Sequence, residues 1–276
     1  MVRKSADGHI SACVETISLD DLPPGDVLIQ VAYSSLNYKD ALASQGHPGV
    51  VRSFPHVPGI DCAGTVVEST SPDFRSGDEV LVTGHELGAG RWGGFAAYVR
   101  VPAEWIVQLP HGLTLRDAMI YGTAGFTAAQ CVQAIAARDI GPERGSVVVT
   151  GATGGVGSIA VAILAKLGYK VECVTGKAQQ HDWLRRLGAS TILGRDEVSD
   201  DTNRPLLQAR WAAAVDTVGG RPLATILRSL DHRGCVAACG LVAGTDLNLT
   251  IYPFILRGVT LAGIDSAKLF STLTPE

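Results

Sequence analysis

The sequence predicts an α/β protein in which a β-rich domain precedes a doubly wound parallel sheet. Residues 1–120 contain short strand candidates separated by Gly- and Pro-rich turns, which is typical of a small barrel-like β domain. Beyond residue 146, apolar runs of strand length alternate with helical stretches. Near-continuous apolar strands favour a parallel sheet covered on both faces. We therefore expect one domain at 1–120 and a second at 121–264.

Each domain has its own predicted elements. In the first part of the chain, β-branched and apolar runs predict strands at 27–32, 64–68, 79–82 and 95–101. Helical stretches are expected at 114–119 and 128–137, with a Gly-containing break at 122–127. In the second part, strands are expected at 147–150, 170–174, 191–193, 212–218, 235–239 and 259–263. Helices fit 156–167, 179–187 and 223–230.

The composition is that of a globular protein and gives no electrostatic case for nucleic acid. Of 276 residues, 46% are hydrophobic and 18% are charged, and the net charge of −4 favours neither nucleic acid nor an anionic membrane. The N-terminal residues lack the apolar segment of a signal peptide, and no apolar run approaches the ~20 residues that span a bilayer. We therefore expect a cytoplasmic protein whose six scattered cysteines stay reduced.

A Gly-rich turn joins the first strand of the second domain to its first helix. The run Thr150-Gly151-Ala152-Thr153-Gly154-Gly155-Val156-Gly157 follows an apolar strand and opens a helix. Such a helix N-terminus offers free N–H groups to a pyrophosphate; Gly154 would allow its close approach, and Gly157 would let the helix lie close to the strand. Ala152 replaces the usual first glycine of G-x-G-x-x-G, and a tight βα connection is the alternative. In this context the turn predicts a Rossmann dinucleotide site.

The end of the next strand favours NADPH over NADH. Thr175, Gly176 and Lys177 lie where an NAD site carries Asp or Glu for the ribose 2′-hydroxyl. A cation at this point suits a 2′-phosphate, although Lys177 could also be a solvated loop lysine. Glu172 is the competing acidic residue, but its mid-strand position predicts that it lies away from the ribose.

These features resemble the medium-chain dehydrogenase/reductase superfamily, in its zinc-free quinone oxidoreductase-like branch, and most closely the acrylyl-CoA reductase subfamily. The resemblance covers essentially the whole chain. Its marks are the segments 34–42, 54–61, 91–96, 122–128, 150–157, 234–241 and 253–257. It implies a GroES-like catalytic domain, a Rossmann domain with a cleft between the two, and a homodimer in which the strand candidate 259–264 could pair across a two-fold axis.

The resemblance also implies a set of residues that contact NADPH. These are Tyr38, Thr153, Gly154, Gly155, Val156, Thr175, Gly176, Lys177, Arg195, Leu241, Ile255 and Ser266. Arg195 could instead be a surface arginine and Tyr38 a core tyrosine. Asn37 and Asp40 are expected to organise the site rather than to perform chemistry, and Asp61 to orient a turn. Trp92 and Phe95 are expected to fill a core or line a pocket.

No metal site is expected. Zinc-type members of the superfamily ligate the metal through Cys and His, whereas the equivalent segments here, 36–40 and 58–64, lack the Cys and the His respectively. His85 and Glu86 do not form a metalloprotease signature, and Cys235 and Cys239 have no neighbouring partner pair. Without a Lewis acid, reduction of an activated C=C bond is favoured over alcohol–ketone chemistry.

The expected activity is NADPH-dependent reduction of an α,β-unsaturated acyl-CoA, acryloyl-CoA to propanoyl-CoA, with Tyr38 or water as proton donor. Lys39, Arg52 and Arg91 are candidate cations for CoA. The alternatives are an NADPH:quinone oxidoreductase, a non-enzymatic NADPH-binding protein and a scaffold with an empty Rossmann unit. In the superfamily the chain returns to the catalytic domain after the last strand, so residues 265–276 are expected to begin a return that is shortened here.

Overall fold

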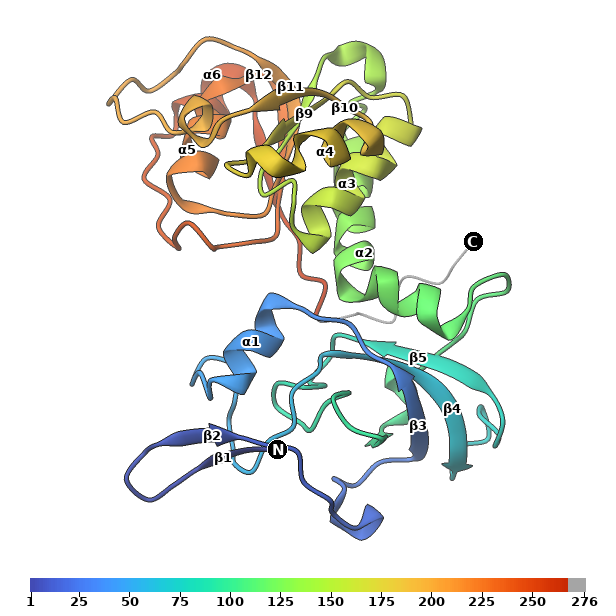
Figure 1. Cartoon of the computed structure of the whole chain (residues 1–276). Coiled ribbons are helices and arrows are strands. Elements are labelled where there is room, and N and C mark those ends of the chain that lie inside the picture. The colour runs from blue at the N-terminus through green and yellow to red at the C-terminus, as the bar shows by residue number, and fades with distance from the viewer. Residues whose placement is uncertain (268–276) are drawn as a thin grey trace. The chain divides into compact units, whose positions relative to one another are not determined.

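The computed structural model describes residues 1–267, which form two compact units. The first unit contains residues 1–123 together with 266–267, and the second contains residues 124–265. Residues 268–276, most of the segment expected to start the return, lie outside the described part. The α/β class is confirmed, with an antiparallel sheet in the first unit and a parallel sheet in the second (Figure 1).

The first unit is built on a five-stranded antiparallel sheet with the order β6-β3-β4-β5-β7. The strands are β3 (Val27–Tyr33), β4 (Asp61–Ser69), β5 (Glu79–Thr83), β6 (Tyr98–Val101) and β7 (Val107–Gln108). Alternate side chains such as Val27, Ile29 and Val80 enter one buried cluster, as the period of a half-buried strand requires. The short strands β1 (Val2–Lys4), β2 (Ile10–Ala12) and β7 and the helix α1 (Tyr38–Ser44) were not predicted.

The expected break at 122–127 is a kink at a single residue. The helix α2 (Leu115–Ala136) continues through this segment, and only Gly122 departs from helical geometry, with φ 48° and ψ −153°. A left-handed φ of this kind is accessible to glycine without steric cost, so the other residues of the segment stay helical. The strand expected at 95–101 is also shorter than predicted, since β6 begins at Tyr98.

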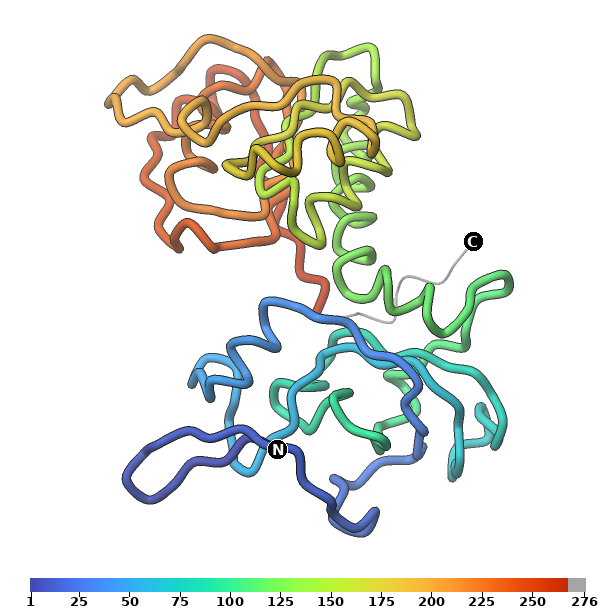
Figure 2. The backbone as a smooth tube through the Cα atoms, viewed as in Figure 1, coloured from blue at the N-terminus to red at the C-terminus, as the bar shows by residue number. Residues whose placement is uncertain are grey.

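The second unit contains a six-stranded sheet in which every neighbouring pair is parallel. Its strands are β8 (Val147–Val149), β9 (Val171–Val174), β10 (Ala189–Leu193), β11 (Trp211–Asp216), β12 (Leu230–Ala238) and β13 (Thr260–Gly263). The order β10-β9-β8-β11-β12-β13 corresponds to 3-2-1-4-5-6 in chain order, the arrangement of the dinucleotide-binding doubly wound fold. The strand order therefore changes its direction of progress across the sheet between β8 and β11. Figure 2 traces the backbone of this unit in the colours of the sequence bar.

Helices cover both faces of this sheet, as was predicted from its near-continuous apolar strands. Val147 and Val149 face a cluster that includes the second half of α2, α3 (Gly155–Lys166) and α4 (His181–Leu187). Val148 faces the opposite cluster, with α5 (Gly220–Ser229) and α6 (Tyr252–Arg257). Since successive side chains of a strand point to opposite faces, both layers are anchored by the same three residues.

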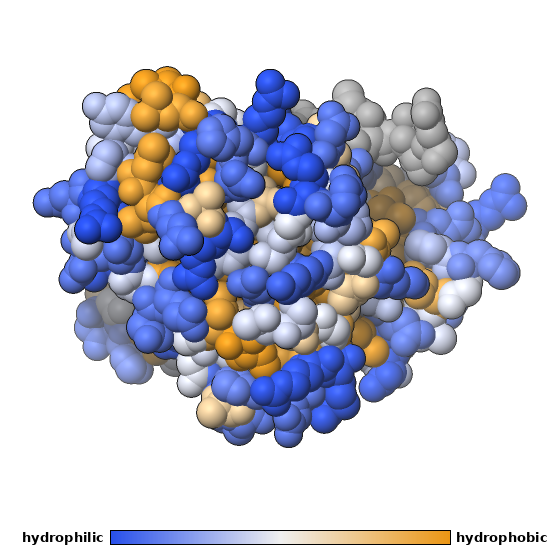
Figure 3. Space-filling view, turned by 90° about the horizontal axis from the view of Figure 1, so that it is seen from above, coloured by the Kyte–Doolittle hydropathy of each residue, from blue (hydrophilic) through white to orange (hydrophobic). Residues whose placement is uncertain are grey.

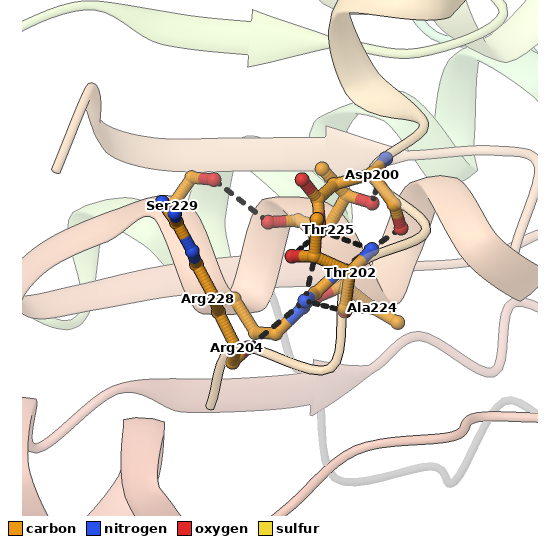
Figure 4. Close-up of polar contacts among 7 residues, drawn as sticks. All are labelled: Asp200, Thr202, Arg204, Ala224, Thr225, Arg228 and Ser229. Carbon is orange, nitrogen blue, oxygen red and sulfur yellow. Dashed lines mark hydrogen bonds and ion pairs between the residues drawn. The ribbon is translucent and has the colours of Figure 1, made fainter. Parts of the chain in front are cut away.

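A buried arginine of α5 holds the irregular loop that precedes β11. Arg228 donates to the carbonyl oxygens of Thr202 at 2.8 Å, Arg204 at 2.9 Å and Asp200 at 3.1 Å, and pairs with the Asp200 carboxylate (Figure 4). The loop carbonyls have no strand partner, so the guanidinium satisfies them. This cluster is a structural brace for the loop rather than part of the nucleotide turn.

Within residues 1–267, no helix has both the length and the apolar character to cross a membrane. The face drawn in Figure 3 shows hydrophobic residues in small groups among hydrophilic ones.

Candidate functional site

The Gly-rich turn has the geometry that its position between β8 and α3 requires. Gly151 has φ 56°, and a Cβ at this residue would lie 2.2 Å from the Thr217 hydroxyl. A Cβ at Gly157 would lie 2.3 Å from the Gly151 carbonyl oxygen. Gly157 therefore permits the close approach of helix and strand that was predicted, and Gly151 makes the tight turn that Ala152 does not make.

Gly154 stands immediately before α3 and is less constrained. Its backbone is extended, with φ −86° and ψ 173°, and a Cβ would meet only the Gly151 carbonyl oxygen, at 3.2 Å. The N–H groups of the first turn of α3 have no partner within the helix, which leaves them available to an anion. The turn thus satisfies the backbone requirements of a dinucleotide phosphate site.

A buried carboxylate connects the carboxyl ends of β8 and β11, the two neighbouring strands at which the strand order changes direction (the switch point). Asp216 accepts hydrogen bonds from the Thr150 hydroxyl at 2.8 Å and from the Gly219 N–H at 2.7 Å. Thr150 in turn accepts from the Thr217 N–H at 2.9 Å. Burial raises the pKa of Asp216, while these hydrogen bonds oppose the rise. The network fixes the carboxyl ends of β8 and β11, where this fold binds its ligands. Asp216 was not predicted; the signal was a carboxylate inside the apolar run 212–218.

The side chain of Arg195 lies beside the end of β9. An ideal Cβ at Gly176 would lie 2.9 Å from the Arg195 Nε, so this side chain lies directly over the Gly176 backbone. Arg195 belongs to the short helix η5 (Arg195–Val198) after β10 and makes no hydrogen bond or ion pair within residues 1–267. The Thr175 hydroxyl accepts from the Lys177 N–H at 3.1 Å, which shapes the strand end.

Glu172 does not compete for this position. Its carboxylate accepts from the Trp211 Nε1 at 2.9 Å, in the middle of β9. This pairing is consistent with the expectation that Glu172 lies away from the ribose. The acidic residue that an NAD site would use has no counterpart among Thr175, Gly176 and Lys177.

A cavity of about 660 Å³ in the second unit is lined by residues of the Gly-rich turn, of the end of β9 and of η5. Three of the predicted cofactor residues line it, namely Thr153, Thr175 and Arg195. Arg221, at the start of α5, also lines it and was not predicted. Seven predicted residues of this unit do not line this cavity: Gly154, Gly155, Val156, Gly176, Lys177, Leu241 and Ile255. Leu241 borders a separate, open hollow beside the ends of β12 and β13, and Ile255 is exposed on α6.

The first unit presents Tyr38 at the start of α1, with 61% of the residue exposed. The turn before it is fixed from both sides. The Asn37 N–H donates to Asp40 Oδ2 at 2.8 Å, and the Gly59 and Ile60 N–H groups donate to Asp40 Oδ1 at 3.1 and 2.9 Å. Burial raises the pKa of Asp40, and the hydrogen bonds from Asn37 and Ile60 oppose this rise. Asn37 and Asp40 therefore organise the segment that carries Tyr38.

Asp61 connects the same segment to the kink in α2. Its carboxylate accepts from the Asn37 Nδ2 at 2.8 Å, from the Thr123 N–H at 3.0 Å and from the Thr123 hydroxyl at 2.6 Å. Asp61 is completely buried. The prediction that it orients a turn is confirmed, because its partner is the residue directly after the Gly122 kink.

Trp92, Phe95 and Ser266 are the remaining candidates of the first unit. Trp92 donates to the Pro55 carbonyl at 2.8 Å, and both Trp92 and Phe95 line an apolar cavity of about 670 Å³ beside β6, as expected of pocket-lining residues. Ser266 follows β13 and approaches Gly84 through its carbonyl oxygen. Within residues 1–267, no three His, Cys, Asp or Glu side chains come together as metal ligands would.

Two family models match the chain. Residues 23–111 match the alcohol dehydrogenase GroES-like domain, and residues 155–274 match the zinc-binding dehydrogenase model. The chain is 51% identical over 266 residues to "Probable acrylyl-CoA reductase AcuI" of Escherichia coli (strain K12), covering 96% of this chain and 82% of the relative. It is also 51% identical over 263 residues to "Putative quinone oxidoreductase YhfP" of Bacillus subtilis (strain 168), covering 95% and 79%.

Solved structures agree with these matches. Escherichia coli K-12 YhdH with bound NADPH superposes with a TM-score of 0.94 at 50% identity, covering 98% of this chain and 83% of that one. Bacillus subtilis yhfP with NAD bound superposes with a TM-score of 0.93 at 49% identity, covering 98% and 82%. The chain belongs to the medium-chain dehydrogenase/reductase family, in the quinone oxidoreductase-like group that includes proteins named as acrylyl-CoA reductases.

Proposed function

We propose that this protein is an oxidoreductase that uses NADPH to reduce the C=C bond of an α,β-unsaturated acyl-CoA, with acryloyl-CoA as the substrate and propanoyl-CoA as the product. The observation that carries the cofactor choice is Arg195, a guanidinium lying over Gly176 at the strand end. The choice of substrate is supported by the 51% identity to a protein named as a probable acrylyl-CoA reductase.

The residues present fit NADPH. The glycine turn leaves no side chain between the start of α3 and an approaching pyrophosphate, and Thr153, Thr175 and Arg195 share one cavity. Thr175, Gly176, Lys177 and Arg195 would hold the 2′-phosphate end, because a guanidinium and an ammonium both complement a phosphate dianion. When bound, NADPH supplies the hydride that the β-carbon of the enoyl thioester accepts.

Tyr38 is proposed to donate the proton that the α-carbon requires. A tyrosine hydroxyl can donate a hydrogen bond, and the Asn37–Asp40–Asp61 network holds the backbone of the turn directly before Tyr38. Leu241, Ile255 and Ser266 are proposed as further cofactor contacts on the family resemblance alone.

The second candidate function is NADPH:quinone oxidoreduction, which the 51% identity to the YhfP protein supports. It would use the same cofactor residues. The deciding experiment follows NADPH oxidation at the nicotinamide absorbance with acryloyl-CoA and a simple benzoquinone in parallel. Turnover of acryloyl-CoA alone supports the reductase, and turnover of quinone alone assigns the second function. NADPH binding without either turnover supports a non-enzymatic binding protein, and no binding supports an empty scaffold.

We further propose a cytoplasmic homodimer. β13 pairs with β12 along one edge and has no second strand partner within residues 1–267. An edge strand of this kind needs a cover or a partner, and a second copy related by a two-fold axis would supply one. Light scattering of the protein tests this assembly: a monomer mass at micromolar concentration would contradict it.

A further inference from the structure

A polar cavity lies in the first unit. None of the predicted cofactor residues lines it, although Lys39 and Ala267 in its wall are next in sequence to Tyr38 and Ser266. The cavity has a volume of about 320 Å³. Charged and aromatic side chains line it, namely Lys39, Arg52, His85, Glu86 and Trp105. This volume is at the lower end of small-molecule sites, which suits one end of a ligand rather than a whole ligand.

The cavity is locally positive in a chain whose net charge is −4. The Lys39 ammonium has no hydrogen bond or ion pair within residues 1–267. Arg52 has Glu86 as its ion-pair partner, at 3.4 Å, and its side chain remains 74% exposed. Two cations thus face one carboxylate, and the exposed ion pair is weak enough for Arg52 to exchange Glu86 for a stronger anion.

An aromatic wall stands beside these cations. The His85 ring stacks on the Trp105 indole, with centroids 5.2 Å apart and planes at 7°. The Arg91 guanidinium lies 5.7 Å from the centre of the same indole, and its Nε and Nη2 are buried without a hydrogen-bond partner among the described residues. Burial lowers the pKa of His85, so its ring is neutral at pH 7 and offers a flat aromatic surface.

The backbone holds His85 in an unusual conformation. His85 has φ 54° and follows Gly84, which has φ 71°. The Gly84 N–H donates to the Ile60 carbonyl at 3.1 Å and the His85 N–H donates to the Ala267 carbonyl at 2.8 Å. A left-handed non-glycine residue persists only where its surroundings fix it, and such residues are concentrated at binding sites.

We propose that this cavity binds the nucleotide end of the acyl-CoA substrate, with its phosphates on Lys39 and Arg52 and its adenine against the His85–Trp105 wall. The inference rests on the proposed acyl-CoA reductase function. Phosphate oxygens complement both cations, and a purine stacks on aromatic side chains irrespective of its hydrogen-bonding edge. Glu86 opposes a phosphate here, so it limits the affinity rather than contributing to it.

The test compares two substrates with the same reacting group. Acryloyl-CoA carries the nucleotide, and acryloyl-N-acetylcysteamine lacks it. We expect Lys39→Gln and Arg52→Gln each to raise KM for acryloyl-CoA about threefold to tenfold, with kcat and the KM for the truncated thioester unchanged. Glu86→Gln is expected to lower KM for acryloyl-CoA. Lys4→Gln, which removes an exposed lysine of β1, is the matched control, and thermal melting verifies that each variant folds.

Other results would overturn the inference. Equal effects on both thioesters would place Lys39 and Arg52 at the reacting group, and no effect on either would remove them from substrate binding. The affinity for NADPH must stay unchanged, since a loss would assign the cavity to the cofactor. If the wild-type protein reduces neither thioester, the proposed function fails; calorimetric titration with free CoA then tests the cavity separately, and equal affinities of wild type and variants would reject it.

Discussion

Arg195 is predicted to discriminate NADPH from NADH, and its replacement by glutamine isolates this effect. The side chain is solvent-exposed, but its Nε lies close to the Gly176 backbone, so it is already oriented at the strand end. A hydrogen bond to a charged group contributes about 1.5–3 kcal/mol, and exposure places Arg195 in the lower half of that range. A loss of about 1.5–2 kcal/mol corresponds to an affinity roughly 10- to 30-fold lower for NADPH.

The assay measures the Kd of NADPH and of NADH by nicotinamide fluorescence for wild type, Arg195→Gln and the control Arg186→Gln. Arg186 is an exposed arginine in the last turn of α4 and does not line the cavity. The affinity for NADH should not change, because NADH has no 2′-phosphate. Raising the salt concentration should reduce the difference in NADPH affinity between wild type and Arg195→Gln, because salt screens the charge of Arg195. Equal losses of NADPH and NADH affinity, or none for NADPH, would refute this role for Arg195; the NAD-bound yhfP structure makes this comparison necessary.

Five other substitutions give four separate tests. Gly157→Ala places a Cβ 2.3 Å from the Gly151 carbonyl and should cost about 1–3 kcal/mol of stability in chemical denaturation with weaker NADPH binding, whereas Gly154→Ala, whose nearest contact is 3.2 Å, should be milder. Asp61→Ala removes the acceptor of three partly buried hydrogen bonds from Asn37 and Thr123 and should lower the free energy of unfolding by about 1–3 kcal/mol; an unchanged melting temperature would contradict its bracing role. Tyr38→Phe should reduce kcat about 100-fold or more with an unchanged Kd for NADPH, and an unchanged kcat would leave water as the donor. Burial raises the pKa of Asp216 above 3.8, so its ionisation costs stability above the raised pKa, and this cost disappears as the pH falls through that value towards 3.8. The stability of Asp216→Asn relative to wild type should therefore be greatest near neutral pH and decline on acidification.

The parallel sheet could be predicted because its signals are local. All six strands of the second unit were expected from apolar runs, and strands that alternate with helices are expected to pair in parallel. The turn 150–157 was recognised because strand, glycines and helix adjoin in the sequence. What the sequence could not show was which glycine makes the turn, since the clash that fixes Gly151 comes from Thr217, 66 positions later.

The missed elements are short and depend on distant partners. α1 has seven residues, too few for a helical period to be visible, and the buried Asp40 holds it to the N–H groups of Gly59 and Ile60. Arg221 was missed although it follows Gly219-Gly220 just after β11. The rule that ligands bind at the carboxyl ends of strands beside the switch point could have identified it.

Asp61 shows how a shared fold can carry a different site. It belongs to the segment where zinc-type relatives are expected to present a histidine, and the zinc-binding dehydrogenase model matches the second half of the chain. Its Oδ1 accepts the Thr123 hydroxyl, and its Oδ2 accepts both the Asn37 amide and the Thr123 N–H. A carboxylate engaged by three donors has its charge compensated by hydrogen bonds, and Asn37 and Thr123 are directed toward it rather than toward a metal. The same position therefore braces the turn of Tyr38 against the α2 kink.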